Sequence, residues 1–136
     1  MVLKVYCDAN IFIDYFDERS DKLRPLKDFA FEFFSKGWNC SFNLIVSDWL
    51  LSELKRYLED KQIDEVLDKF KRNNKLIFVK EEAGYRDEAR KISEHWQDSL
   101  HAILASKAQA DYLATRNIKD FSGCEKLVKV VFPEFI

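Results

Sequence analysis

Apolar residues along the chain form two kinds of pattern, short continuous runs and repeats at helical spacing. The continuous runs predict five strands, at residues 2–7, 39–46, 76–79, 111–115 and 127–132. Apolar residues spaced three and four apart predict helices between these strands. Strands that alternate with helices favour an α/β fold in three layers, α/β/α, with a central, mainly parallel sheet of about five strands.

The helical repeats also indicate where several helices begin and end. The predicted helices cover residues 11–16, 23–34, 50–58, 63–70, 85–96 and 99–108. Ser47 is a suitable N-cap for the third, because its hydroxyl can accept a bond from the first turn. Gly37 is a suitable end for the second, and Asp98 a suitable N-cap for the last. The elements follow one another without an internal repeat or a recognisable linker.

The composition is that of one globular domain. A chain of 136 residues with 47% hydrophobic residues can bury a core, and we expect a single domain over residues 1–136. Its three cysteines form no Cys-x-x-Cys pair, which favours reduced thiols and a cytoplasmic protein. The N-terminus lacks the pattern of a signal peptide, and no apolar stretch approaches the roughly 20 residues of a membrane span. We therefore expect no membrane association.

The formal net charge of −2 does not by itself indicate a protein that binds nucleic acids. A cluster of acids that holds cations lowers this formal charge, however, and a metal-loaded site is far less negative. The 22 lysines and arginines are numerous enough to surround such a site. The charge therefore leaves nucleic-acid binding open.

Asp8 directly follows the first predicted strand and is the most informative acid in the chain. In open α/β sheets, ligands bind at the edge formed by the carboxyl ends of the strands. Right-handed crossovers bring the ends of strands one, two and four to this edge, which places Asp8, Glu53 and residues 115–120 within reach of one another. Topology constrains Asp98 less, because it opens the helix that leads into strand four. Carboxylates gathered in this way suit hard cations such as Mg²⁺.

Each acid also has an ordinary structural interpretation. Asp8 can cap the turn that follows its strand. Glu53 lies at the edge of an apolar helical stripe, where a glutamate can remain solvated. Asp98 can be a simple N-cap, and Asp120 a loop residue.

The two histidines form no metal motif of their own. His95 and His101 are six residues apart with no cysteine nearby, which is not a zinc-binding spacing. His101 lies one turn after Asp98 and could support a polar site, although a packed or surface histidine is the more common case. The chain also lacks the Gly-x-Ser-x-Gly nucleophile motif and a glycine-rich phosphate loop.

Four segments of the sequence resemble the motifs of PIN-domain proteins. Residues 5–14 resemble the opening strand followed by Asp-x-Asn and an apolar helix, and residues 46–54 resemble the second motif with its helical glutamate. Residues 98–105 resemble the third motif, an aspartate that opens a helix of small residues. Residues 112–121 resemble the fourth, a strand that ends in Thr-Arg-Asn and is followed by Asp-Phe. The four occur in family order, and within the family the chain is most similar to small toxins of the VapC type.

The resemblance implies a metal-dependent ribonuclease that uses Mg²⁺ or Mn²⁺. It implies that Asp8 and Asp98 are the principal metal ligands. Glu53 would complete the acidic pocket and orient or deprotonate the attacking water. Asn10 and Thr115 would form hydrogen bonds with the carboxylates or with the scissile phosphate. The residues expected to contact the RNA backbone are Arg116 and Lys119.

The fourth acidic position departs from the family pattern. Many relatives carry Asp where this chain has Asn117, so we expect a lower metal affinity at a second site. Asp120, three residues later, could fill this catalytic position instead. Ala9 replaces a Thr or Ser that is common in relatives, which removes one hydroxyl. Neither departure removes the other three acids.

Three functions are compatible with these residues. The first is a metal-dependent endoribonuclease, either a toxin paired with a protein antitoxin or an RNA-processing nuclease, and the sequence does not decide between the two. The second is a catalytically weak PIN scaffold that binds RNA or a partner without cutting. The third is a haloacid-dehalogenase-type phosphatase with Asp8 as nucleophile. It ranks last, because such enzymes need a second Asp where this chain has Asn10. The resemblance also implies a homodimer.

Overall fold

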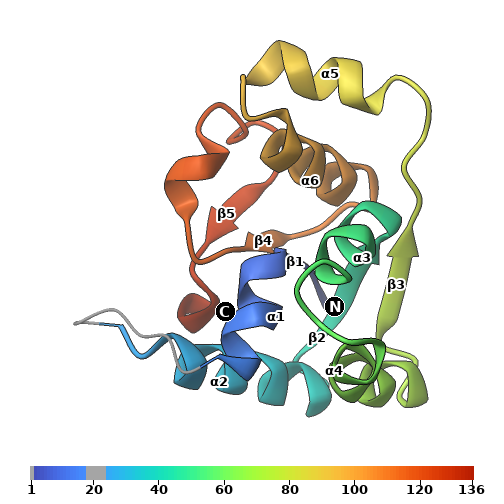
Figure 1. Cartoon of the computed structure of the whole chain (residues 1–136), viewed down its shortest axis with the longest axis vertical. Coiled ribbons are helices and arrows are strands. Elements are labelled where there is room, and N and C mark those ends of the chain that lie inside the picture. The colour runs from blue at the N-terminus through green and yellow to red at the C-terminus, as the bar shows by residue number, and fades with distance from the viewer. Residues whose placement is uncertain (1, 18–23) are drawn as a thin grey trace.

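The computed structural model describes residues 2–17 and 24–136 (Figure 1). Its strands are β1 (Leu3–Cys7), β2 (Phe42–Ser47), β3 (Leu76–Val79), β4 (Tyr112–Ala114) and β5 (Lys129–Val131). In this part of the chain the strands form one parallel sheet in the order β3-β2-β1-β4-β5. The predicted α/β fold with a mainly parallel sheet of about five strands is thus confirmed.

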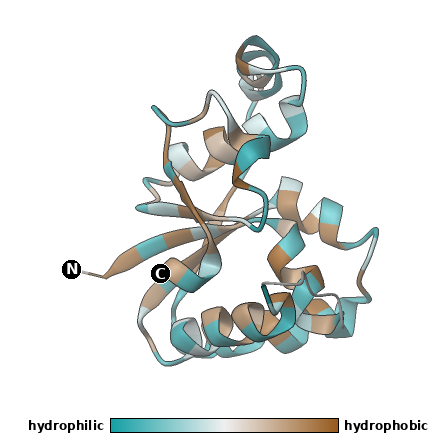
Figure 2. Cartoon of the chain, turned by 90° about the vertical axis from the view of Figure 1, so that its left-hand side faces the viewer, coloured by the Kyte–Doolittle hydropathy of each residue, from teal (hydrophilic) through white to brown (hydrophobic). Residues whose placement is uncertain are grey.

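Helices lie on both sides of this sheet and complete the three predicted layers (Figures 1 and 2). They are α1 (Ala9–Phe16), α2 (Leu26–Trp38), α3 (Asp48–Leu54), α4 (Asp60–Arg72), α5 (Tyr85–Ile92) and α6 (Trp96–Lys107), with the 3₁₀ turns η1 (Ile118–Phe121) and η2 (Pro133–Phe135). α2 and α4 lie on one side of the sheet, and α5 and α6 lie on the other. None of these described helices combines the length and the apolar composition that crossing a membrane requires.

The register of the sheet brings several strand ends to the same level. β1 pairs with β4 up to Cys7 and Ala114, and these two residues are fully buried. Asp8 and Thr115 therefore follow neighbouring strands at the same edge. β2 also runs parallel to β1, so α3 begins at this edge as well. The topology thus gathers the segments that were expected to share a site.

The boundary between the helices predicted for residues 85–96 and 99–108 lies earlier in the chain than expected. α5 ends at Ile92, and Ser93 has an extended backbone with φ −157° and ψ 155°. The Ser93 hydroxyl accepts a hydrogen bond from the His95 amide at 3.0 Å, a local bond that competes with a continuous helix. Trp96 then begins α6. The prediction was wrong because the apolar repeat continues across this break.

The predicted N-caps are correct at one of two positions. Ser47 caps α3, and its side-chain oxygen accepts a hydrogen bond from the Leu50 amide at 3.0 Å. Asp98 does not cap α6, because the helix begins at Trp96 after His95. Asp98 lies instead in the first turn, where the helix dipole favours a carboxylate.

Gly37 does not end α2, which continues to Trp38. A Cβ atom at residue 37 would lie 2.5 Å from the Phe70 ring and 2.8 Å from the Phe42 ring. Both rings are fully buried. The glycine is therefore required because α2 approaches α4 and β2 so closely.

We expect Gly37→Ala to destabilise the protein by about 2 kcal/mol. Alanine favours a helix over glycine by about 1 kcal/mol, but the new methyl group overlaps two buried rings, and overpacking a core costs about 1–3 kcal/mol. Urea unfolding measures the free-energy difference. Glu32→Ala, at an exposed position of the same helix, is the control and should change little. A Gly37→Ala protein as stable as the wild type would contradict the close approach.

Candidate active site

Asp8 lies at the carboxyl end of β1 and is 7% exposed. One carboxylate oxygen accepts the Ala9 amide at 2.7 Å and caps α1, and the other accepts the Thr115 hydroxyl at 2.8 Å. Burial raises the pKa of Asp8, and the nearby His101 and these hydrogen bonds only partly offset the burial. Asp8 therefore serves as a cap and also places a buried carboxylate at the sheet edge.

Thr115 connects β4 to the residues around Asp8. Its buried hydroxyl accepts hydrogen bonds from the Asn10 side-chain amide at 3.2 Å and from the Asn117 backbone amide at 3.1 Å. The Asn10 side-chain oxygen in turn accepts the Arg116 backbone amide at 3.2 Å. These bonds hold the ends of β1 and β4 together. The contact between Thr115 and Asp8 is of the kind expected for residues that form hydrogen bonds with the site carboxylates.

Asp98 is coupled electrostatically to the other predicted acids. Its part-buried carboxyl has a pKa raised from the ordinary value of 3.8 to about 6. Burial is the largest cause of this shift, and His101 opposes it. The shift is increased by the negative charges of three neighbours, Asp8, Asp120 and Glu53. The structure therefore brings all four predicted acids into one electrostatic cluster.

His101 lies inside this cluster, in the polar role that the sequence offered as the less common of two interpretations. The residue is 1% exposed. Its Nε2 forms a hydrogen bond with Glu53 and lies 3.9 Å from the Asp8 carboxylate. Its Nδ1 is 2.7 Å from the Tyr6 hydroxyl, which is itself 2.6 Å from the Ser47 hydroxyl. A buried polar chain thus runs from the acids into the core.

The carboxylates favour the charged form of His101. Burial lowers the pKa of an imidazole, but the hydrogen bond to Glu53 and the charges of Asp8, Glu53 and Asp98 outweigh it and raise the pKa. The imidazolium donates from Nε2 to Glu53 and from Nδ1 to Tyr6. The sequence feature that indicates this role is the spacing of Asp98 and His101. They are three residues apart and therefore share a face of α6.

Arg116 is paired within the protein. Its Nε lies 3.0 Å from Oδ2 of Asp14, a carboxylate of α1 that is 2% exposed. This pair offsets much of the charge with which Arg116 was expected to contact RNA. Lys119 lies on η1 and is exposed, so it is the better placed of the two predicted basic residues. Asp14 is a buried acid that sequence reasoning did not single out.

The segment after β4 forms the wall of a pocket beside the acids. This pocket, called the η1 pocket below, has a volume of about 460 Å³ and is lined by Arg116, Asn117, Ile118, Lys119, Asp120 and Phe132. Asp120 belongs both to this wall and to the acidic cluster, because its charge raises the pKa of Asp98. Asn117 carries no charge and is bonded through its backbone to Thr115. Of the two candidates for the fourth acidic position, Asp120 is the one whose charge acts on Asp98.

Comparison with known proteins identifies the fold. No protein-family model matches the chain, and no curated protein matches its sequence. Among solved structures, one similar chain belongs to the crystal structure of VapBC2 from Rickettsia felis bound to a DNA fragment from their promoter. It is 19% identical with a TM-score of 0.59, over 96% of this chain and 98% of that chain. Another belongs to the structure of FitAB bound to an IR36 DNA fragment. It is 12% identical with a TM-score of 0.60, over 97% of this chain and 96% of that one.

The chain has a PIN-like fold. The similarity spans nearly the whole of each chain, so it covers the sheet and the helices on both sides. The predicted resemblance to the PIN domain is therefore confirmed at the level of the fold. At these identities the similarity concerns the fold and not the activity.

In this PIN-like fold the oxygen donors suit a hydrated hard cation. Within residues 2–17 and 24–136, no group of three or more His, Cys, Asp or Glu side chains is arranged to hold a metal ion. Mg²⁺, however, is usually bound by one or two carboxylates together with waters and substrate phosphates. Asp8 and Asp98 have raised pKa values, so a cation beside them would relieve unfavourable negative charge. The residues present therefore fit Mg²⁺ or Mn²⁺.

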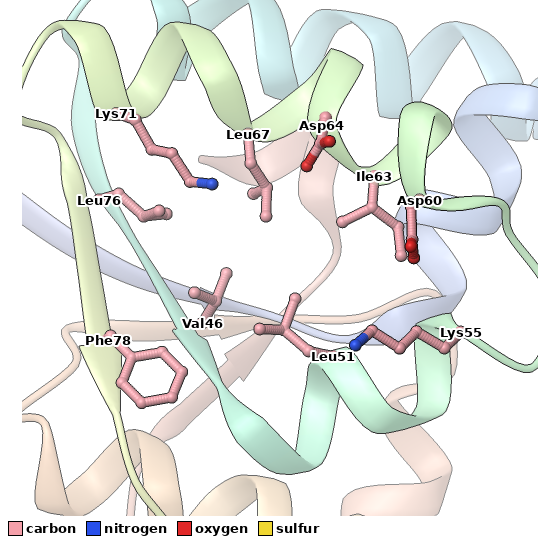
Figure 3. A pocket seen from close by; sticks show the side chains of 10 residues that line it. All are labelled: Val46, Leu51, Lys55, Asp60, Ile63, Asp64, Leu67, Lys71, Leu76 and Phe78. Carbon is pink, nitrogen blue, oxygen red and sulfur yellow. The ribbon is translucent and has the colours of Figure 1, made fainter.

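A second concave surface of the PIN-like fold lies between α3, α4 and the β2–β3 side of the sheet (Figure 3). This groove has a volume of about 470 Å³. Apolar side chains form its centre, and charged side chains reach in from its ends, namely Lys55, Asp60, Asp64 and Lys71. It contains none of the predicted site residues. The volume of a concave surface therefore does not by itself distinguish this groove from the pocket beside the acids.

Proposed function

We propose that the protein is a metal-dependent endoribonuclease that hydrolyses RNA phosphodiester bonds in its acidic pocket. The observation that supports this most is the gathering of four acids at one edge of a PIN-like sheet, with the pKa of Asp98 raised to about 6. Asp8 is buried and Glu53 and Asp98 are part buried, and carboxylates that repel one another in such surroundings are unfavourable for folding. Their presence is therefore better explained by function than by stability.

Asp8 and Asp98 are the residues that would hold Mg²⁺ or Mn²⁺. When bound, such an ion supplies an activated water and offsets the charge that develops on the phosphate. The Ala9 amide and the Thr115 hydroxyl fix the two oxygens of Asp8, so this carboxylate has one orientation. Asn10 holds Thr115 in turn. These residues preorganise the pocket and do not need to move when RNA arrives.

Glu53 is the residue we assign to the attacking water. Its side chain is 25% exposed, so it reaches solvent, whereas His101 behind it is buried. The hydrogen bond from His101 orients the Glu53 carboxylate, which retains further acceptor capacity for a water proton. The buried imidazolium also lowers the mutual repulsion of the acids around it.

We further propose that this nuclease is the toxin of a toxin–antitoxin pair. Chains of the same fold occur in VapBC2 and in FitAB, and both structures include a DNA fragment. The motifs most resemble those of VapC-type toxins. A cytoplasmic protein antitoxin and a second copy of this chain are the partners this proposal requires. Interfaces commonly cover large apolar side chains, and several are exposed, including Phe31, Tyr57, Phe78 and Phe135.

Cleavage of a mixed single-stranded RNA pool tests the proposed activity. We expect cutting with Mg²⁺ or Mn²⁺, none with EDTA, and none by the Asp8→Asn variant under any condition. Asp64→Asn, at an exposed position of α4, is the matched control and should cut like the wild type. Cutting that survives in EDTA or in Asp8→Asn would contradict the proposal. An uncut pool would favour the catalytically weak scaffold.

A further inference from the structure

The η1 pocket is a binding site in its own right, beside the acids. We propose that it holds one nucleotide of the RNA, next to the phosphodiester bond that the acidic pocket cuts. The inference rests on the proposed nuclease function and extends it to the substrate. A volume of about 460 Å³ falls within the range of small-molecule sites, roughly 300–1,000 Å³.

The η1 pocket is joined to the acidic cluster by shared residues. Asp120 lines the pocket and also raises the pKa of Asp98. The backbone of Asn117, another lining residue, donates to the Thr115 hydroxyl that bonds to Asp8. A nucleotide in the pocket would therefore lie adjacent to the acids.

Phe132 supplies the surface on which a base can stack. The Arg24 guanidinium lies 4.0 Å from the centre of the Phe132 ring and covers one face of it, so a base would stack on the part of the ring that lines the pocket. Arg24 is held there by Glu134, with nitrogen–oxygen distances of 3.1 and 3.2 Å, and by the Arg116 carbonyl at 3.4 Å. Single-stranded bases are bound by aromatic rings and by arginine planes of this kind, without strong sequence preference. The ring and the guanidinium are thus positioned before a ligand arrives.

The polar residues of the pocket suit the rest of a nucleotide. Lys119 is exposed, and its ammonium group suits a phosphate. The Asn117 side chain has both donors and acceptors for a base edge. Arg116 of this wall is paired with Asp14, so Lys119 is the residue we assign to the phosphate. An aromatic surface, an amide and a cation together describe a nucleotide rather than a bare anion.

Titration of the ¹⁵N-labelled wild-type protein with AMP in EDTA tests the proposal, because AMP has no phosphodiester bond to cut and EDTA removes binding that depends on a metal ion. We expect saturable shifts of the backbone amides of residues 116–121. Inorganic phosphate alone should bind about tenfold more weakly, since it lacks the stacking base. Phe132→Leu should weaken AMP binding about tenfold and Lys119→Gln about fivefold. Lys61→Gln, an exposed lysine of α4, should leave it unchanged.

Equal affinities for phosphate and AMP, or shifts confined to other residues, would overturn the nucleotide site. Unchanged AMP binding in both Phe132→Leu and Lys119→Gln would do so as well. If Phe132→Leu fails to fold, the exposed Lys119→Gln decides alone. The nuclease proposal can fail independently of the nucleotide site. A protein that binds AMP here but leaves RNA intact would support the nucleotide site and contradict the nuclease activity. A protein that cuts RNA but binds no AMP would support the nuclease activity and contradict the nucleotide site.

Discussion

The Asp98→Asn protein is expected to lose RNA cleavage by about a thousand-fold and yet to be more stable than the wild type at pH 7.5 without metal. The activity falls because the variant lacks one of the two carboxylates assigned to the cation. The stability rises because burial and the neighbouring acids make an ionised Asp98 unfavourable. We expect a gain of about 1 kcal/mol, since water screens a carboxyl that is only part buried.

The pH dependence of this gain follows from the direction of the pKa shift. The folded protein binds the Asp98 proton more tightly than the unfolded chain does, with a pKa of about 6 against 3.8. Wild-type stability therefore falls as the pH rises through this window and stays lower above it. Urea unfolding of both proteins in EDTA at pH 3.5 and pH 7.5 measures the effect. A variant that is less stable at pH 7.5, or that gains equally at both values, would contradict it.

The His101→Gln protein is expected to lose about 3 kcal/mol of stability near pH 6, because it leaves buried carboxylates without their cationic neighbour. His101 is 1% exposed and bonds to both Glu53 and Tyr6, so the substitution removes a charge and disturbs two hydrogen bonds in a buried position. His95→Gln is the matched control, because His95 is exposed and its side chain makes no capping bond. Urea unfolding measures the free energy of unfolding of both variants, which should fall in His101→Gln and change little in His95→Gln.

The His101 effect has the same sign with pH as that of Asp98, because both groups bind their proton more tightly in the folded protein. The acids raise the folded pKa of His101, so its stabilisation is complete below the ordinary value of 6.5 and is lost as the pH rises through the raised value. The cost of His101→Gln should therefore be larger at pH 6 than at pH 9.5. An equal cost at both values would mean that the buried imidazole is neutral.

The fold was predictable from sequence because buried parallel strands are continuous apolar runs and the helices between them are amphipathic. Boundaries were less predictable where one residue leaves the regular backbone. The strand predicted for residues 39–46 begins at Phe42, because Cys40 adopts a positive φ of 69° after α2. Gly37 was interpreted as a helix end, and only the positions of Phe70 and Phe42 reveal that it serves close packing.

The site was predictable as far as strand ends determine it. Asp8 and Thr115 follow paired strands, so topology alone places them together. His101 was named only as one possible support for a polar site, because a single histidine on an apolar helix carries no motif and its partners come from distant segments. The pairing of Arg116 with Asp14 was likewise invisible, since it depends on where α1 packs relative to the end of β4.

Calorimetric titration with Mn²⁺ tests the central claim most directly, which is that Asp8 and Asp98 form a divalent-cation site. The account predicts saturable binding by the wild type that is lost in Asp8→Asn and in Asp98→Asn, while Asp64→Asn binds normally. The account is contradicted if the wild type does not bind Mn²⁺, or if binding persists in both site variants. The acids would then have a structural role, with their charge offset by His101.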